Sequence, residues 1–506
     1  MRSRNASPHI GPWRNPARRV RHGTTRNYFD SGCSVWMSSP SRLSAPVPPA
    51  SPLQKNKFSH IAIYEQRAAT GGVWNTSHVS QEPGFSIPRT TPTSEHEYVV
   101  VEDGHDAGAR VELVSPVYDN LETNIPHGLM SYTDLEFPAG TPLFPEHGTV
   151  LAYIQQYGRD VEHLVTFETQ VRDVRKTTAE DGRLGWTVET KDLKSGVVSA
   201  KSYDAVVAAS GHYSDPFVPD IPGIAEFEAV QPGAILHSKF YRRPEQFTGK
   251  KVVVVGNAAS GIDISHQIAT SAQLPVLISE KDVPGAPPAA SNNWSRHVGQ
   301  IVELLPVTRS VRFSSGRIED GVDAVIFCTG YHYSFPFLGS LAPGITAPNG
   351  TYADHLWEHM LYAPDPTLAL LVIPKRIVPF PFAEAQMAVI ARIWAGRLNV
   401  PNQSERDAWV RRCGAESAPG ARHTFGYPQD VDYINRLHAL SGQARPDAER
   451  GLENDGAGKR SPYWGEELSW VRSQIFAIKV ASRALGERRK ECKTLADLGF
   501  DFQAAK

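Results

Sequence analysis

The sequence predicts an α/β fold with two dinucleotide-binding units, the second inserted into the first. The strongest observation is the stretch 250–263, where a run of four valines is followed by Gly256 and, five residues on, by Gly261. An unbroken apolar run of this kind is typical of a strand buried on both faces of a parallel sheet. The other two observations are a strand at 61–64, followed by an acid and a glycine pair, and an apolar strand at 323–329.

The glycines of the valine-rich stretch suit a turn that holds a pyrophosphate. Gly256 ends the strand where the backbone turns, and Gly261 stands where the following helix packs close to the strand. Backbone N–H groups at the N-terminus of that helix bind the pyrophosphate, and we expect Ser260 to take part. The middle glycine of the fingerprint is Ala258 here. A buried strand and helix without a ligand is the alternative interpretation.

The first unit is marked by Glu65, which closes the strand 61–64. An acid at this position accepts hydrogen bonds from the hydroxyls of a ribose. A solvent-exposed carboxylate at a strand end is the alternative. Gly71, Gly72 and Trp74 follow closely, and we expect them to bind the same nucleotide.

Five motifs follow one another in a fixed order along the chain. Gly233, His237 and Tyr241 stand at steps of four, with a basic residue behind them and Gln231 before them. The other motifs lie at 65–74, 120–126, 323–331 and 379–386. Over residues 61–403 the set resembles the flavin-containing monooxygenase family, of the fungal, dimethylaniline monooxygenase-like type, in which Phe stands in place of Gln231.

The resemblance implies two Rossmann-like domains, with the NADP-binding domain inserted in the FAD-binding domain. We place the two parts of the FAD-binding domain at 58–214 and 323–506. The NADP-binding domain is expected at 215–322. A polar insert on the surface is expected near 413–461, because that stretch is rich in Gly, Arg and Asp.

Further cofactor-binding residues follow from the same resemblance. Ser279 and Lys281 match the positions that hold the 2′-phosphate, which favours NADPH over NADH; an ordinary surface lysine is the alternative for Lys281. Thr329, Gly330 and Gln386 match family positions close to the flavin.

Asn124, in the motif 120–126, is the candidate catalytic residue. By resemblance, its amide helps to hold the flavin C4a-hydroperoxide and the bound NADP. An amide suits this task because it donates a hydrogen bond without supplying an acid proton. The alternative is a structural Asn that caps the loop before Pro126.

The implied enzyme is an NADPH- and FAD-dependent monooxygenase. It inserts one oxygen atom of O₂ into a soft N- or S-nucleophile of a small molecule, and the other atom leaves as water. One alternative is a Baeyer–Villiger monooxygenase acting on ketones, but that family has Trp where Tyr241 and Arg242 stand. Another is a catalytically impaired relative that binds only NADP.

Residues 1–57 depart from the family pattern. Met37, Ser39 and Arg42 stand where the family has the three glycines of the FAD turn, and no strand is evident before them. Either the FAD site is damaged, which puts activity in doubt, or this segment is a disordered or mistranslated start, which we favour. Its Arg- and Ser-rich composition also resembles a mitochondrial transit peptide, but its prolines oppose an amphipathic helix.

Composition excludes several classes of function. A formal net charge of −2 gives no bulk attraction to nucleic acid or anionic lipid. Without a run of 18 apolar residues, we expect no transmembrane helix. Four cysteines without paired spacing indicate a reducing compartment, the cytoplasm. The histidines show no metal-ligand spacing, so no metal is expected. A homodimer is one assembly that the sequence allows.

Overall fold

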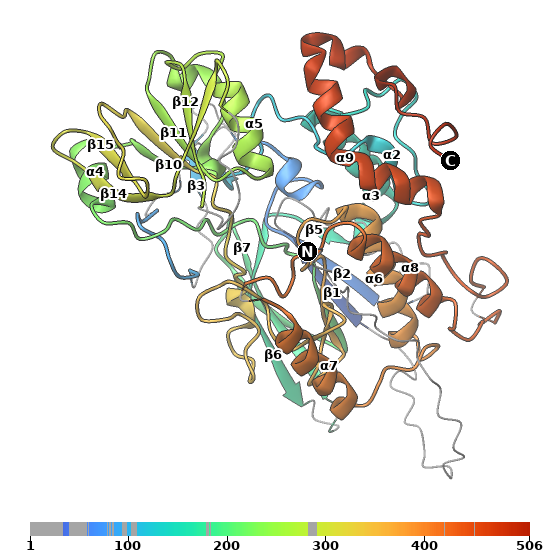
Figure 1. Ribbon diagram of the computed structural model, residues 1–506. Coiled ribbons are helices and arrows are strands. Elements are labelled where there is room, and N and C mark those ends of the chain that lie inside the picture. The colour runs from blue at the N-terminus through green and yellow to red at the C-terminus, as the bar shows by residue number, and fades with distance from the viewer. Residues whose placement is uncertain are drawn as a thin grey trace.

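Two sheets of seven and five strands form the body of the protein in the computed structural model (Figure 1). The structure describes residues 34–39, 58, 60–77, 79, 82, 85–93, 99–102, 109–178, 182, 184–281, 291–418, 420–449 and 451–506. The two sheets lie in separate lobes, with β1 and β2 in one and β10 to β12 in the other. The predicted α/β class with two Rossmann-like domains is confirmed.

The first sheet has the strand order β18-β19-β20-β9-β1-β2-β5. β1 is parallel to both β2 and β9, and β2 is parallel to β5. The strands of this sheet are β1 (Ser34–Ser39), β2 (His60–Glu65), β5 (Val165–Thr166), β9 (Ala205–Ala208), β18 (Leu356–Trp357), β19 (Leu361–Tyr362) and β20 (Leu368–Leu370).

β1 corrects one expectation about the N-terminal segment, because a strand does precede the predicted FAD turn. It lies between β2 and β9, where Met37 pairs with Ile63 and Ser39 with Glu65. Met37 is therefore inside a strand rather than at the turn. This strand is hard to predict from sequence, because it mixes serines with apolar residues. Arg42 and the rest of 40–57 lie outside the described residues, so the damaged turn stays a prediction.

The second sheet is fully parallel, in the order β10-β17-β11-β12-β13. The valines at the start of β11 are fully buried, as their unbroken apolar run predicts. Helix α5 (Ala259–Ile268) follows β11 directly. The strands are β10 (Ile235–His237), β11 (Val252–Val255), β12 (Val276–Ser279), β13 (Ser295–Val298) and β17 (Ala324–Phe327).

The position of β17 corrects the domain boundary expected at residue 323. This strand was assigned to the second part of the FAD-binding domain, but it pairs with β10 and β11 at the centre of the second sheet. A continuous apolar run indicates burial on both faces, yet it does not say which of two sheets the strand joins.

The remaining strands of the described residues form three smaller antiparallel sheets. One of them is a meander of the antiparallel strands β6 (Thr169–Thr178), β7 (Leu184–Asp192) and β8 (Val198–Tyr203). The others are β3 (Val99–Glu102) with β4 (Ala109–Glu112), and β14 (Ile301–Leu305) with β15 (Ser310–Phe313) and β16 (Ile318–Glu319).

Helices cover the sheets and close the first lobe. The α-helices besides α5 are α2 (His127–Met130), α3 (His147–Gly158), α4 (Ile224–Val230), α6 (Pro379–Trp394), α7 (Gln403–Glu416), α8 (Gln429–Ser441) and α9 (Glu466–Ala484). The 3₁₀-helices are η1 (Gly72–Trp74), η2 (Arg159–Leu164), η3 (Ser238–Phe240), η4 (Pro244–Phe247), η5 (Pro336–Leu338), η6 (Gly486–Glu491) and η7 (Ala496–Leu498). Among the described residues, no helix has the length and apolar character needed to cross a bilayer.

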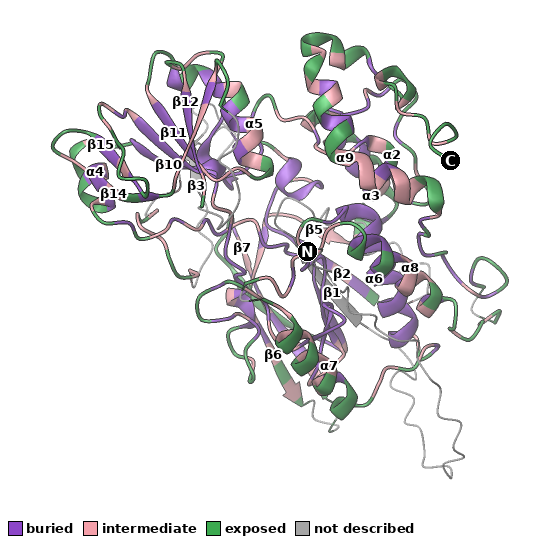
Figure 2. Ribbon diagram, viewed as in Figure 1, coloured by how far each residue is buried: buried purple, intermediate pink, exposed green. Residues whose placement is uncertain are grey.

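Two helices are more buried than their sequences suggest. Every residue of α6 is buried, including Glu384 and Arg392 (Figure 2). The stretch 413–461 was expected to be a polar surface insert, but its helix α8 packs Val431, Ile434 and Leu437 into the core of the first lobe. The polar residues on the outer face of α8 explain why a surface segment was expected from the sequence.

A cluster of buried histidines lies beside the first sheet. His359 and His423 share a hydrogen bond of 3.0 Å between their Nδ1 atoms. Nε2 of His423 lies 2.8 Å from the carbonyl oxygen and 3.3 Å from the backbone nitrogen of Ala353, so both nitrogens of this ring contact the protein. Burial, with smaller contributions from neighbouring groups, lowers the pKa of His423 to about 4 and holds that of His359 well below its usual value. The pair is therefore neutral in the folded protein.

We expect this cluster to make the protein acid-labile. An unfolded His protonates near pH 6.5, whereas folded His423 stays neutral down to about pH 4. The stabilising contribution is thus complete above pH 6.5 and is lost as the pH falls toward 4, because the unfolded chain binds more protons. At about 1.4 kcal/mol per pKa unit, His423 accounts for about 3 kcal/mol.

The measurement is the free energy of unfolding by urea between pH 7 and pH 4, in the parent and in His423→Gln. The variant should show a shallower fall across this range. An identical pH slope in both proteins would contradict the assignment to His423.

Candidate active site

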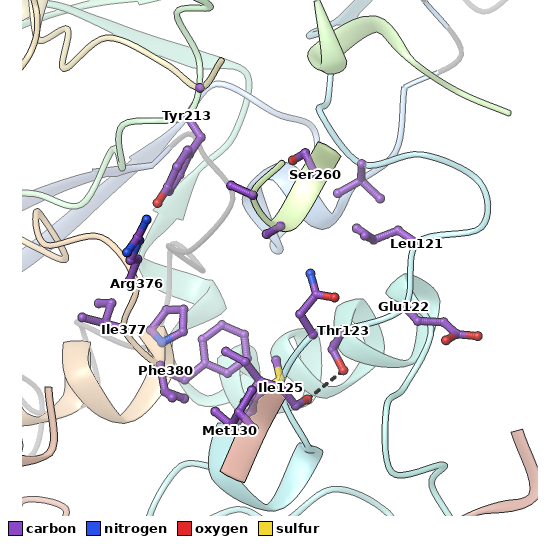
Figure 3. A pocket seen from close by; sticks show the side chains of 18 of the residues that line it. Leu121, Glu122, Thr123, Ile125, Met130, Tyr213, Ser260, Arg376, Ile377 and Phe380 are labelled. Carbon is purple, nitrogen blue, oxygen red and sulfur yellow. Dashed lines mark hydrogen bonds between the residues drawn. The ribbon is translucent and has the colours of Figure 1, made fainter. Parts of the chain in front are cut away.

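A cavity of about 470 Å³ lies where the first turns of α5 and α6 meet α9 and the loop before α2 (Figure 3). Its wall is mostly apolar and is lined by polar side chains at a few points. They include the side chains of Thr123, Asn124, Tyr213, Ser238, Ser260, Tyr331, Arg376 and Arg472. Of the residues predicted from sequence, Trp74, Asn124, Ser260 and Gly330 line this cavity.

Asn124 is a half-buried residue of the cavity wall. Within the described part of the chain, its amide has no hydrogen-bond partner. The local turn is closed instead by Thr123, whose Oγ1 donates to the carbonyl of Ile125 at 2.9 Å (Figure 3). The loop before Pro126 is therefore formed without the Asn124 amide, which is left for a ligand.

Helix α9 holds the Asn124 segment in place from the far end of the chain. Lys479 Nζ donates to the carbonyl of Thr123 at 2.8 Å. Glu122 points away from the cavity in Figure 3 and pairs with Arg489 at 2.8 Å and with Lys479 at 3.7 Å. Burial lowers the pKa of Lys479 to about 8, against the opposing effect of Glu122. These contacts from α9 and from Arg489 in η6 fix the two residues that directly precede the candidate catalytic amide.

The turn between β11 and α5 leaves no room for a side chain at either glycine. At Gly256, where φ is +98°, a Cβ would lie 2.9 Å from the carbonyl oxygen of Cys328. At Gly261 a Cβ would lie 1.8 Å from the carbonyl oxygen of Gly256. The close helix–strand approach expected from the fingerprint is present, and Ser260 in the first turn of α5 lines the cavity. The residues present fit a dinucleotide pyrophosphate bound to the N-terminus of α5.

The predicted FAD residues lie at the carboxyl end of β2. Glu65 is fully buried, and its Oε1 accepts from the backbone N–H of Arg67 at 2.8 Å. Gly71 has φ +127°, and a Cβ there would lie 2.3 Å from Leu151 Cδ1. The buried indole N–H of Trp74, at the cavity wall, has no acceptor among the described residues. Gly72, also at positive φ, completes a glycine-lined turn that fits the dinucleotide predicted here.

The predicted 2′-phosphate residues are less clearly arranged. Ser279 is buried, and its hydroxyl donates to the carbonyl of Gly299 at 3.0 Å. Lys281 is exposed two residues on. Between them Glu280 pairs with His297, a contact that the sequence did not indicate. Lys281 is therefore the accessible cation at this strand end.

Gly330 lines the cavity, whereas the other two predicted flavin-side residues are engaged within the protein. The Oγ1 of Thr329 donates to the carbonyl of Phe217. Gln386 is fully buried on α6, where its Oε1 accepts from the backbone N–H of Val372 at 2.9 Å and its Nε2 donates to Tyr433 at 3.0 Å. The structure thus places Gln386 away from the cavity wall.

His237 and Tyr241 of the signature brace the second lobe. The Nδ1 of His237 accepts from the backbone N–H of Lys239 at 3.1 Å, so its Nε2–H donates to the carbonyl of Gly330 at 3.0 Å. Tyr241 is fully buried and donates to Gln267 at 3.1 Å. Both contacts match a structural role.

Sequence reasoning missed several cavity residues. Tyr213, Arg376, Phe380 and Arg472 all line the wall. Tyr213 directly follows the tight turn after β9, and Phe380 lies in the 379–386 motif, so their positions gave a weak signal. Arg376 and Arg472 carried no sequence signal, because an isolated arginine in a sequence cannot be distinguished from an ordinary surface cation.

One fully parallel sheet and one mixed sheet, each with a glycine-lined turn after one of its parallel strands, lie beside a mostly apolar cavity. This arrangement defines a two-dinucleotide oxidoreductase. The chain belongs to the flavin-binding monooxygenase-like family, whose sequence pattern matches residues 108–284 and 298–444. It is a flavin-dependent monooxygenase, and the cofactors of this family are FAD and NADPH.

Individual relatives agree with this assignment. The flavin-containing monooxygenase FMO GS-OX-like 4 of Arabidopsis thaliana is 32% identical over 359 residues, which cover 68% of this chain and 73% of the relative. The thiol-specific monooxygenase of Saccharomyces cerevisiae is 31% identical over 65% of this chain and 76% of its own length.

Solved structures share the architecture. S-allyl-L-cysteine S-oxygenase from Allium sativum superposes with a TM-score of 0.70 at 27% identity, covering 91% of this chain and 95% of that one. Cyclohexanone monooxygenase in its open form gives a TM-score of 0.52 at 11% identity, covering 82% of this chain and 98% of that one, a likeness of fold alone.

Proposed function

We propose that the protein uses NADPH to insert one oxygen atom of O₂ into a soft sulfur or nitrogen atom of a small molecule. The observation that carries this proposal is the Asn124 amide, which lies in the wall of a mostly apolar cavity and has no partner in the described chain. The thiol-specific and S-oxygenating relatives favour sulfur over nitrogen.

Each part of the cavity has a role in this reaction. When bound, the flavin accepts hydride from NADPH and activates O₂. The turn of Gly256 and Gly261 holds the NADPH pyrophosphate on the N-terminus of α5. The apolar wall, which includes Ile377 and Phe380, keeps water from the reacting atoms. The Asn124 amide donates a hydrogen bond to the activated oxygen without giving up a proton.

The test combines a flavin spectrum with product analysis. The purified chain, supplied with excess FAD, should oxidise NADPH and convert a thioether to its sulfoxide, with one atom from ¹⁸O₂ in the product. Purification without flavin, followed by recovery on adding FAD, would point to the weakened turn predicted near residue 42. A chain that binds NADPH but never flavin would be the impaired relative, and the proposal would fail.

Lys281 should set the preference for NADPH over NADH. Lys281→Ala should weaken the binding of NADPH by about 1–3 kcal/mol and leave the binding of NADH nearly unchanged. The reason is that only NADPH offers a 2′-phosphate to the ammonium group. The measurement is KM for each cofactor, with the exposed Lys201 on β8 as a control position. An equal loss for both cofactors would make Lys281 an ordinary surface residue.

A further inference from the structure

Arg376 is a cation at the cavity wall that the reaction itself does not require. It lies in the segment between β20 and α6, lines the cavity and is exposed. Within the described residues, no carboxylate pairs with its guanidinium. A cation at the edge of a mostly apolar cavity is a typical device for fixing the orientation of a charged ligand.

The backbone of Arg376 is held in a conformation that arginine rarely adopts. Its φ is +60°, in the left-handed region that favours glycine. The carbonyl of Arg376 accepts from Arg472 Nη2 at 2.9 Å, and Arg472 is in turn anchored to buried Asp430 at 2.7 Å. A non-glycine residue kept at positive φ by surrounding contacts often belongs to a ligand site.

The two cavity arginines therefore differ in what their side chains do. The guanidinium of Arg472 is used to bind Asp430 and the Arg376 carbonyl. The guanidinium of Arg376 reaches toward Tyr213, whose phenol oxygen points toward it in Figure 3. Ile377 and Phe380 continue the same wall with apolar surface. This wall thus combines a cation and a hydroxyl with an apolar surface.

We propose that Arg376, together with the Tyr213 hydroxyl, binds the carboxylate of the substrate and makes the enzyme selective for carboxylate-bearing thioethers. A guanidinium matches a carboxylate with two parallel hydrogen bonds. The sulfur-bearing part of the ligand then lies along the apolar wall toward Asn124. This inference rests on the proposed function.

The phosphates of the nicotinamide cofactor are the other anions that Arg376 could bind. Other sites suit these phosphates better. The pyrophosphate fits the turn of Gly256 and Gly261, and Lys281, just after β12, is the candidate for the 2′-phosphate. Arg376 belongs to neither element. The two sources of negative charge are separated by the experiment below.

The experiment compares 3-(methylthio)propanoate with its neutral amide, which has nearly the same shape. Binding to the oxidised, FAD-loaded protein is measured by calorimetry, and KM for both thioethers and for NADPH by steady-state kinetics. In Arg376→Gln, Kd and KM for the acid should rise about tenfold to a hundredfold. The Kd and KM for the amide, and the KM for NADPH, should change by less than about threefold.

Two further variants sharpen the result. Arg376→Lys keeps the positive charge but loses the two parallel donors of the guanidinium. Its Kd and KM for the acid should therefore lie between those of the parent and those of Arg376→Gln. Arg411→Gln removes an exposed arginine from α7, which does not line the cavity, and should behave as the parent. Flavin content and the thermal midpoint confirm that each variant folds.

The outcomes separate this inference from the proposed function. Equal losses for acid and amide would overturn the carboxylate contact, and a rise confined to KM for NADPH would assign Arg376 to the cofactor instead. If neither thioether is oxygenated by the parent, the proposed function fails. In that case acid-selective binding lost in Arg376→Gln would still support the carboxylate contact, and its absence would overturn it.

Discussion

Replacing Asn124 with alanine should leave NADPH oxidation nearly intact and divert the reduced oxygen from product to H₂O₂. Hydride transfer needs the nicotinamide and flavin rings to be placed against each other, a geometry that the Asn124 amide need not control even if it contacts the bound NADP. Oxygen transfer depends on a donor at the cavity wall, and Asn124 supplies an amide with no partner in the described chain. Losing one such preorganised donor typically costs about 2.7–4 kcal/mol, a factor of roughly 10² to 10³.

The ratio of sulfoxide to H₂O₂ under air is the measurement. Asn124→Asp serves as a matched variant, because it keeps the shape of the side chain and removes the N–H donor. It should uncouple the enzyme as strongly as Asn124→Ala. If Asp behaves as the parent and only Ala is impaired, the side chain matters for loop packing before Pro126 rather than for oxygen transfer.

The second large effect is expected from Gly261→Ala. The new methyl group would lie 1.8 Å from the carbonyl oxygen of Gly256, so α5 must move away from β11. Overpacking of this kind typically costs about 1–3 kcal/mol of stability, and it would also displace the helix N-terminus to which we assign the pyrophosphate. We expect KM for NADPH to rise at least about tenfold.

Flavin content and reduction of the flavin by dithionite should stay unchanged in Gly261→Ala, because Glu65, Gly71 and Gly72, which we expect to bind the FAD nucleotide, lie at the end of β2 in the other sheet. Gly148→Ala is the control, since this exposed glycine of α3 has open space around its Cβ position. That variant should keep normal kinetics. Normal use of NADPH by Gly261→Ala would show that α5 does not carry the pyrophosphate.

The parts of the protein that could be predicted from sequence are those with a local physical cause. The valine run of β11 signals burial on both faces, and Gly256 with Gly261 signals a turn with a close helix behind it. Each property depends on neighbours within ten residues. The Asn124 segment was found differently, through the resemblance of a short motif to a known family.

The rest depends on contacts between distant segments. Membership of β17 in the second sheet follows from its pairing with β10 and β11, which no apolar pattern encodes. Arg376 became a candidate only when its backbone conformation and the cavity wall were seen together. The burial of α8 reflects packing against α6, another element fixed by tertiary structure.

The contacts between α9 and the Asn124 segment affect the order in which the parts of the candidate active site can form. Lys479 and Thr123 are 356 positions apart, so the ribosome makes one long before the other. Domains fold in the order of synthesis, and both nucleotide-binding lobes can therefore be largely formed while the catalytic loop still lacks its brace. If Asn124 acts as we propose, oxygen transfer becomes efficient only after α9 has packed, and we expect loss of α9 by proteolysis to leave an oxidase that consumes NADPH without forming product.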